Sequence, residues 1–254
     1  MRKIFASLMI ATSLVGCASN ENQLKETLKK NPKIVFDIIE ENPEQFVEVV
    51  NRAAQKAQQK QYERQLADMK TEQEKELKDP KKPTLSDDRR LAGDSNSKLI
   101  IVEYADFQCP ACRMAFDSLN QFKEKYKGKF QFYFKHMPLD FHKMAYPAAQ
   151  YFEAVKLQNN QKAVKFFNLV FENQRQMSDE AFLKKMAQNV GADIKRLQLD
   201  IKSENIKKII DADMAEFQSF GFTGTPVILI NGVSLNGAQK LEELERVAKL
   251  TGGL

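Results

Sequence analysis

The 254-residue sequence lacks several features that would mark a specialised class of protein. It has no tryptophan and three cysteines, and so few cysteines exclude a small domain held together by many disulfides. Ten glycines and eight prolines are too few for a collagen-like or a Pro/Gly-rich disordered chain. No apolar run reaches the roughly 18 residues that a membrane-spanning helix needs.

The sequence also lacks a long stretch of charge of one sign. It has 39 Lys and Arg against 34 Asp and Glu, and the two signs alternate along the chain. Because no basic stripe results, we expect no nucleic acid partner. A hydrophobic share of 43% is enough for a core, and the length allows one domain with an appendage or two small domains.

Residues 1–16 resemble a secretory signal peptide, because a short positive start precedes an apolar stretch too short to span a membrane. The stretch ends at Leu14-Val15-Gly16-Cys17, which resembles the bacterial lipobox that is cut before a lipid-modified cysteine. We expect Cys17 to carry acyl chains, such as palmitate, that anchor the protein in the cell envelope. Ala18 in place of Asp favours, in a Gram-negative cell, the outer membrane with the body facing the periplasm. The alternative is an ordinary signal peptide with a cysteine nearby by chance.

Residues 17–84 are predicted to form a lipidated arm of helices that ends in a linker. Two Asn-Pro pairs in this region each place a helix-capping residue before a proline at the first helical position. Together with the helix-forming composition around them, these pairs predict helices over residues 21–30, 32–41 and 43–78. Asp79–Pro83 ends the last of these helices, and 84–97 is predicted to be a polar linker.

The arm carries more apolar residues than it can bury by itself. They lie on the second predicted helix and at the start of the third: Ile34, Val35, Ile38, Ile39, Phe46, Val47, Val49 and Val50. One interpretation is a solvated stalk that lifts the body off the membrane. We favour a homo-oligomer formed through residues 21–78, because a stalk does not need such an apolar load.

Residues 85–254 have the pattern of a compact α/β domain. Apolar runs predict strands, and a long helical stretch at about 141–219 separates the second strand from the third. Asn231-Gly232 predicts a two-residue hairpin turn between the last two strands. The expected strands are 99–105, 130–134, 226–230 and 233–235, and the other expected helices are 110–126 and 238–250.

Cys109-Pro110-Ala111-Cys112 directly follows the first buried strand and opens a helix. A C-x-x-C pair can bind zinc or copper, or it can act in redox chemistry. The remaining zinc ligands would have to be His136 and His142, whose spacing does not fit a zinc finger, so we expect no zinc site. Copper binding stays as a weaker alternative.

The redox interpretation follows from the position of the pair. The amino end of a helix offers unpaired N–H groups and a positive dipole, which lower the pKa of the Cys109 thiol. Cys112 lies one turn later, within reach of Cys109. Cys109 can therefore form a mixed disulfide with a substrate, and Cys112 can resolve it. This chemistry needs no cofactor.

The order strand, C-P-A-C, helix, helical insert and Gly224-Thr225-Pro226 resembles the DsbA-like branch of the thioredoxin superfamily over residues 85–254. The resemblance implies an α/β (α+β) thioredoxin fold with a helical insertion. It also implies roles for individual residues: Cys109 attacks, Cys112 resolves, Pro226 is the cis-proline opposite the pair, Thr225 pairs with the substrate strand, and Glu103 is the buried acid that assists proton transfer.

The dipeptide Pro110-Ala111 departs from the Pro-His best known in this family. Without an imidazole beside it, Cys109 is expected to be less acidic, and the disulfide less oxidising, than in the strongest oxidants. Oxidation and isomerisation of disulfides both stay open.

The expected function is that of an enzyme, a protein thiol:disulfide oxidoreductase or isomerase. Its partners would be unfolded or misoxidised exported proteins and a membrane or periplasmic protein that recycles the pair. The alternative is a redox-inert, lipid-anchored surface scaffold or adhesin with a thioredoxin-like body.

Overall fold

The computed structural model describes residues 21–254, which form two compact units that meet between Gln65 and Leu66. The predicted signal peptide and Cys17 lie outside the described residues. None of the helices between residues 21 and 254 is both long and apolar enough to span a membrane.

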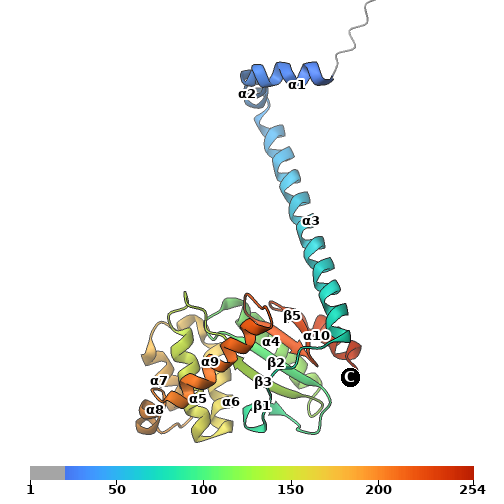
Figure 1. The fold of residues 1–254 in the computed structure, drawn as a ribbon. Coiled ribbons are helices and arrows are strands. Elements are labelled where there is room, and N and C mark those ends of the chain that lie inside the picture. The colour runs from blue at the N-terminus through green and yellow to red at the C-terminus, as the bar shows by residue number, and fades with distance from the viewer. Residues whose placement is uncertain (1–20) are drawn as a thin grey trace, which may run out of the picture. The chain divides into compact units, whose positions relative to one another are not determined.

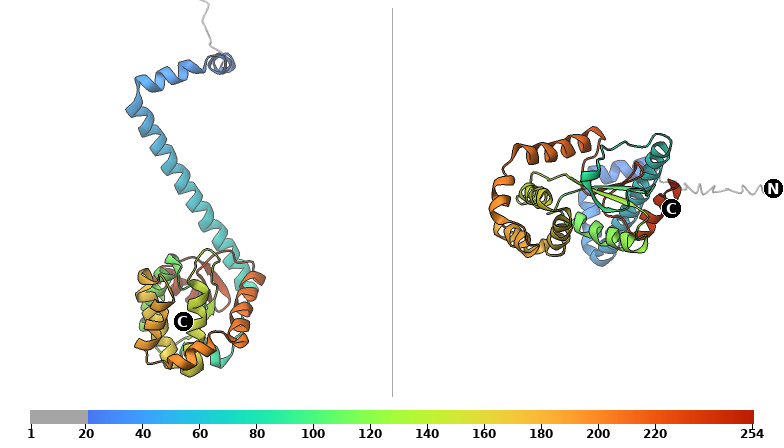
Figure 2. Two further views of the ribbon diagram at one scale, coloured as in Figure 1. Left: turned by 90° about the vertical axis from the view of Figure 1, so that its left-hand side faces the viewer. Right: turned by 90° about the horizontal axis from the view of Figure 1, so that it is seen from below.

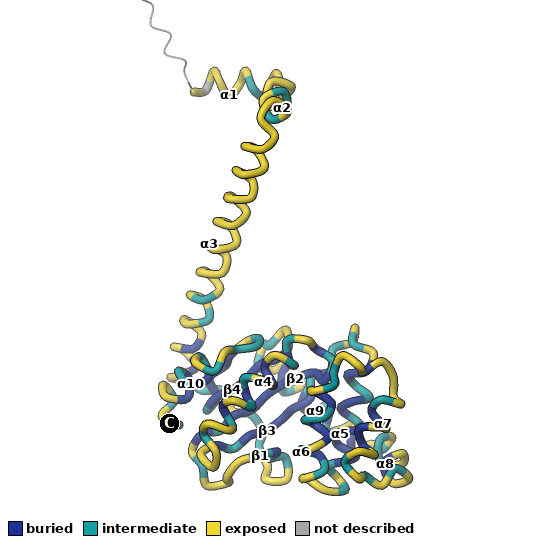
Figure 3. Tube along the Cα trace, turned by 180° about the vertical axis from the view of Figure 1, so that it is seen from behind, coloured by how far each residue is buried: buried dark blue, intermediate teal, exposed yellow. Residues whose placement is uncertain are grey.

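The first unit is helical, as predicted. It contains α1 (Glu21–Lys30), α2 (Pro32–Glu41) and the greater part of α3 (Pro43–Lys78). The side chains of Asn31 and Asn42 do not cap the helices that follow them. Each instead donates a 3.0 Å hydrogen bond to a carbonyl oxygen of the preceding helix, so that these residues end one helix while proline starts the next. The apolar residues of α2 and early α3 are largely exposed (Figure 3).

The second unit is built on a five-stranded sheet with the order β1-β3-β2-β4-β5. The central strand β2 pairs in parallel with β3 and antiparallel with β4. Strands β1 and β5 form the edges, each antiparallel to its neighbour (Figure 1). The strands are β1 (Arg90–Gly93), β2 (Ile100–Ala105), β3 (Gln131–His136), β4 (Val227–Ile230) and β5 (Val233–Asn236).

Strand β1 shows that the prediction of a polar linker over residues 84–97 is wrong for residues 90–93. The preceding residues form the short helix η1 (Asp87–Arg89), and β1 then pairs with β3. Only Leu91 of this strand is buried, so the segment has no alternation that a sequence pattern could detect. Its pairing partner, which is distant in sequence, makes it a strand.

Helices cover both faces of the sheet. Figure 2 shows the sheet between α4 (Pro110–Lys125) on one side and α9 (Glu204–Ser219) on the other. Helix α10 (Leu241–Leu250) packs beside α4. The predicted helical insertion lies between β3 and β4, and besides α9 it contains α5 (Ala145–Gln158), α6 (Asn160–Glu172), η2 (Gln174–Gln176), α7 (Glu180–Asn189) and α8 (Ile194–Asp200).

The two faces have separate hydrophobic clusters. Ile101 and Ala105 of β2 point to the larger one, with α4, α5, α6 and α10. Val102 and Tyr104 point to the smaller one, with Phe217 of α9. Since side chains alternate along a strand, Glu103 faces the larger cluster together with Ile101 and Ala105.

The last turns of α3 belong to the second unit. Glu76 accepts a 2.6 Å hydrogen bond from the Ser234 N–H, and Gln73 donates a 3.4 Å bond to the Ser234 carbonyl. Lys81 N–H donates to the Gly232 carbonyl at 3.0 Å. These contacts cover the outer edge of β5, which would otherwise expose unpaired backbone groups. The compact unit therefore starts before residue 85, where the sequence pattern places the start of the domain.

Candidate active site

Cys109 lies between the carboxyl end of β2 and the first turn of α4, where it is the N-cap residue and Pro110 is the first helical residue. The neighbouring Cys112 thiol, and after it the backbone N–H groups of Cys112 and Ala111, stabilise a negative charge on the Cys109 sulfur. Together these groups outweigh the opposing effect of burial and lower the pKa of Cys109 to about 5. The thiolate is therefore the main form of Cys109 at neutral pH.

Cys112 has the opposite environment. Its side chain is fully buried, and burial raises the pKa of this thiol well above its ordinary value. The backbone N–H of Asp106 lies 3.4 Å from its sulfur. Both cysteines are free thiols in the structure. The pair thus joins a stabilised thiolate to a thiol that holds its proton.

The loop before β4 lies against Cys109. The Thr225–Pro226 peptide bond is cis, and the carbonyl oxygen of Thr225 lies 3.6 Å from the Cys109 sulfur. The Thr225 hydroxyl is buried and has no hydrogen-bond partner in the described part of the chain. The sequence places Thr225 and Pro226 more than a hundred residues from the cysteines, and the fold brings all four together.

Glu103 is fully buried on the face of the sheet that α4 covers. Neither of its carboxylate oxygens has a hydrogen-bond partner among residues 21–254. Burial raises the pKa of this carboxyl, and the charge of Lys123 opposes that rise. Burial in turn lowers the pKa of Lys123, whose ammonium lies 4.4 Å from the centre of the Phe132 ring.

Sequence reasoning did not find Lys123. A signal was present, because Lys123 follows Phe116 and Leu119 at helical spacing and so lies on the edge of the buried stripe of α4. A lysine at such a position needs an anionic partner, but the sequence alone does not say which carboxylate provides it.

The helical insertion holds the loop that carries Cys109. Asp106 accepts hydrogen bonds from the Leu139 N–H at 2.9 Å and from the His142 ring at 2.7 Å. Gln108 accepts from the Met144 N–H at 2.8 Å. Gln174 donates to the carbonyls of Phe107 and Cys109. None of these partners could be assigned from the sequence.

The two histidines have different surroundings. His142 lies beside the active-site loop with Asp106 as its partner, whereas His136 is buried and bonds Glu153 at 2.8 Å. Within residues 21–254 no group of three or more His, Cys, Asp or Glu side chains is placed to bind a metal ion.

The surface around the first turn of α4 carries exposed apolar side chains and a partly polar cavity. Met114 is 64% exposed, and Phe141, next to His142, is 76% exposed. A cavity of about 650 Å³ begins at Pro110 and extends between α4 and η2, with Arg113, Met114 and Gln174 among its lining residues. This cavity lies beside the cysteine pair, since Pro110 is one of its lining residues.

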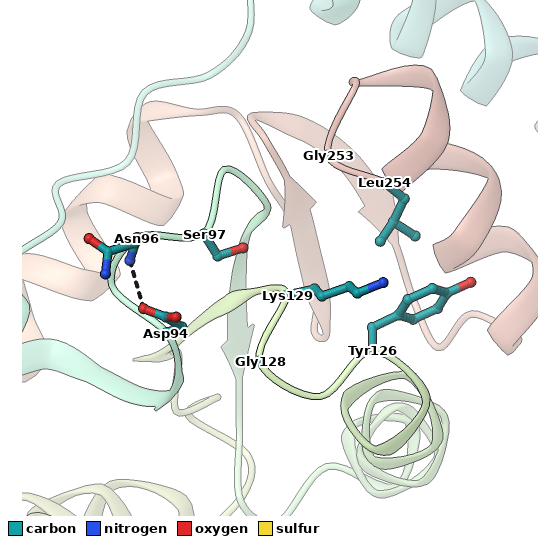
Figure 4. A pocket seen from close by; sticks show the side chains of 8 residues that line it. All are labelled: Asp94, Asn96, Ser97, Tyr126, Gly128, Lys129, Gly253 and Leu254. Carbon is teal, nitrogen blue, oxygen red and sulfur yellow. Dashed lines mark hydrogen bonds between the residues drawn. The ribbon is translucent and has the colours of Figure 1, made fainter.

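A second cavity, of about 500 Å³, lies away from these residues (Figure 4). It is lined by the turn before β2, the turn before β3 and Gly253 and Leu254. Cys109 follows the carboxyl end of β2, so this cavity lies at the opposite end of that strand. It contains none of the predicted site residues.

Comparison with known proteins supports the fold. A family model described as thioredoxin matches residues 85–249. The chain is similar to the probable disulfide bond formation protein D of Bacillus cereus, with 28% identity over 149 residues, 55% of this chain and 68% of that protein. It is also 25% identical over 161 residues to the Na(+)/H(+) antiporter NhaA 1 of Mycolicibacterium vanbaalenii, 61% of this chain but 25% of the antiporter. The chain thus spans about a quarter of that relative.

Solved structures of similar proteins support the same fold. The thiol-disulfide exchange protein alpha-DsbA2 of Wolbachia pipientis has a TM-score of 0.57 and 25% identity over 63% of this chain and 85% of that chain. A linker-deletion mutant of Proteus mirabilis ScsC has a TM-score of 0.55 and 19% identity over 93% of this chain and 98% of that chain, a likeness of fold. Because the family model covers more than half of the chain, the protein belongs to the thioredoxin family, and its fold is the DsbA-like thioredoxin fold.

Proposed function

We propose that this protein is a thiol:disulfide oxidoreductase that acts on exported proteins through Cys109 and Cys112. The observation that carries the proposal is the unequal pair at the start of α4, one thiol acidic and one buried, facing Thr225 and cis-Pro226. The names of the Bacillus and Wolbachia relatives describe disulfide formation and thiol-disulfide exchange, which agrees with this chemistry.

In the oxidising direction, a substrate thiolate attacks the Cys109 sulfur of the Cys109–Cys112 disulfide. A mixed disulfide forms, the bond between the two cysteines breaks, and the Cys112 sulfur takes a proton because its pKa is raised. We assign delivery of this proton to Glu103, which burial holds in its protonated form.

A second substrate thiolate then attacks the substrate sulfur of the mixed disulfide, and Cys109 leaves as a thiolate. Two electrons have passed from the substrate dithiol to the cysteine pair. A membrane or periplasmic oxidant must then remove them, so the proposal includes a redox partner. We assign Thr225 and Pro226 to binding of the substrate strand, because the Thr225 carbonyl lies beside Cys109.

The acidity of Cys109 bears on the direction of the reaction. The attacking cysteine has a pKa of ~7 in thioredoxin, a reducing relative, and of ~3.5 in DsbA, a strong oxidant. The pKa of about 5 for Cys109 lies between these values, which agrees with Ala111 in place of the histidine of the strong oxidants. A stabilised thiolate favours the reduced pair and thus the oxidation of substrates. It also supplies the nucleophile that disulfide isomerisation needs.

We further propose that the arm forms a homo-oligomer, which would present several sites to one substrate and favour isomerisation. Val47 is 55% exposed and Ile38 is 55% exposed, and neighbouring apolar residues of the arm are exposed as well. A second copy of the same surface would bury them. The membrane anchor at Cys17 and the periplasmic location belong to the proposal too.

The test compares wild type, Cys109→Ser and Cys112→Ser on reduced and on scrambled ribonuclease. Cys109→Ser should lose both activities with its circular dichroism unchanged, and Cys112→Ser should accumulate mixed disulfides that identify the substrates. Recovery of scrambled ribonuclease would establish isomerisation, whereas activity on reduced ribonuclease alone would establish oxidation. A folded Cys109→Ser variant with full activity would contradict the proposal and favour a redox-inert scaffold.

A further inference from the structure

Gln174 lies in η2, the short helix that follows α6 in the helical insertion. Its amide nitrogen donates two hydrogen bonds to the active-site loop, to the Phe107 carbonyl at 2.9 Å and to the Cys109 carbonyl at 2.8 Å. Both N–H groups of one side chain therefore bind the loop, on the two sides of Gln108.

The Cys109 carbonyl has a second role at the same place. It accepts the first hydrogen bond of α4, from the Arg113 N–H at 3.2 Å. The orientation of this carbonyl thus determines how α4 begins, and with it where the N–H groups of Ala111 and Cys112 point. Those two N–H groups favour the negative charge of the Cys109 thiolate. The peptide bond after Cys109 leads to Pro110, which has no N–H to hold it.

The neighbouring side chains of η2 do not make such contacts. Gln176 is exposed and bonds the side chain of Asn173 at 3.3 Å, within the same turn. Gln174 is partly buried and also lines the cavity beside Pro110. Gln174 is therefore the residue of this turn that reaches the cysteine pair, and Gln176 offers a matched control.

We infer that Gln174 is a positioning residue of the redox pair, which holds the Cys109 carbonyl so that the first N–H groups of α4 stay directed at the Cys109 sulfur. The inference rests on the proposed function and extends it, because it makes the helical insertion a determinant of the redox balance. The physical reason is that a thiolate gains from N–H donors only while they point at it.

The experiment titrates the Cys109 thiolate by its ultraviolet absorbance in the full-length protein, for wild type, Gln174→Ala and Gln176→Ala. For Gln174→Ala we expect the pKa of Cys109 to rise by about 0.5–1 unit. Because the reduced pair is then less stabilised, equilibration with glutathione should favour the disulfide form by about three- to tenfold. Gln176→Ala should match wild type in both measurements.

A purely structural role would give a different result. It would lower the melting temperatures of the reduced and disulfide forms equally and leave the titration unchanged, and that result would overturn the inference. Gln174→Ala should instead lower the melting temperature of the reduced form more than that of the disulfide form. If Gln174→Ala does not fold, the isosteric Gln174→Glu is measured in its place, and an unchanged titration there would equally overturn the inference.

The outcome also separates this inference from the proposed function. A wild-type protein with an ordinary Cys109 pKa and no Cys109–Cys112 disulfide would contradict the proposed function itself. An acidic Cys109 in wild type, with Gln174→Ala indistinguishable from it, would contradict only the role of Gln174.

Discussion

The two faces of the sheet bury ionisable side chains in opposite ways. On the face that α9 covers, Lys135 contacts the carboxylates of Asp213 and Glu216, and the Tyr104 hydroxyl donates to Glu216. On the face that α4 covers, the carboxylate of Glu103 has no hydrogen-bond partner within residues 21–254. Glu103 and Tyr104 are adjacent in the sequence, so one strand supplies both environments.

The direction of the pKa shifts follows from this difference. Burial alone disfavours the charge of both glutamates, but hydrogen bonds from Lys135 and Tyr104 outweigh it and lower the pKa of Glu216. At Glu103 nothing comparable opposes burial, and the pKa is raised. A paired buried ion contributes to the fold, whereas an unpaired one is available for proton transfer.

The largest expected effect comes from breaking the paired face. Lys135→Met leaves the partly buried Glu216 without its cation, whereas Asp213 keeps its ion pair with Arg89. We expect a loss of about 3 kcal/mol of unfolding free energy in urea titrations. The pKa of Cys109 should not change, because Lys135 contacts Glu216 of α9 on the other face of the sheet. Lys207→Met removes an exposed ion pair and should leave the unfolding midpoint unchanged. Equal midpoints for the two variants would refute the distinction between the faces.

The next effect concerns the unpaired face. Glu103→Gln keeps the side-chain volume and removes the acid that delivers a proton to Cys112. We therefore expect formation of the mixed disulfide from the Cys109–Cys112 disulfide to slow by about a hundredfold at neutral pH. Rapid-quench analysis of the mixed disulfide with a cysteine-containing peptide measures this rate. An unchanged rate in Glu103→Gln would show that the carboxyl does not transfer the proton.

A smaller effect is expected in the pH dependence of stability. Because the pKa of Glu103 is higher in the folded than in the unfolded protein, the folded protein binds more protons once the pH exceeds 4.5. Stability should therefore fall as pH rises, by up to about 1.4 kcal/mol per pH unit. The difference between wild type and Glu103→Gln, measured from about pH 5 to 7, isolates this contribution. If the difference in unfolding free energy between wild type and Glu103→Gln did not change with pH over that range, Glu103 would make no such contribution.

The smallest effect is expected for Lys123. Lys123→Met keeps an apolar chain over Phe132 and removes the charge that opposes the raised pKa of Glu103. We expect the pH profile for formation of the mixed disulfide to shift upward by about one unit. Lys125→Met, exposed on the same helix and paired with Glu245, is the control and should leave the profile in place. Coinciding profiles would show that Lys123 has no influence on Glu103.

Much of the fold could be predicted because its signals are local. The helices of the arm begin and end where the Asn-Pro pairs predict, and four of the five strands match apolar runs. Strand β1 could not be predicted, since it has one buried residue and depends on pairing with β3. The burial of Glu103 was expected from the family resemblance, but the influence of the Lys123 charge on it was not.

The sequence by itself determined the position of the cysteine pair at the start of a helix after a buried strand, because that depends on neighbouring residues. It thereby determined which cysteine is acidic. Only the tertiary structure decided what surrounds the pair: the Thr225 carbonyl, the His142–Asp106 contact and the two hydrogen bonds of Gln174. The physical reason is that these partners come from distant segments, and many polar side chains along the chain could have filled each place.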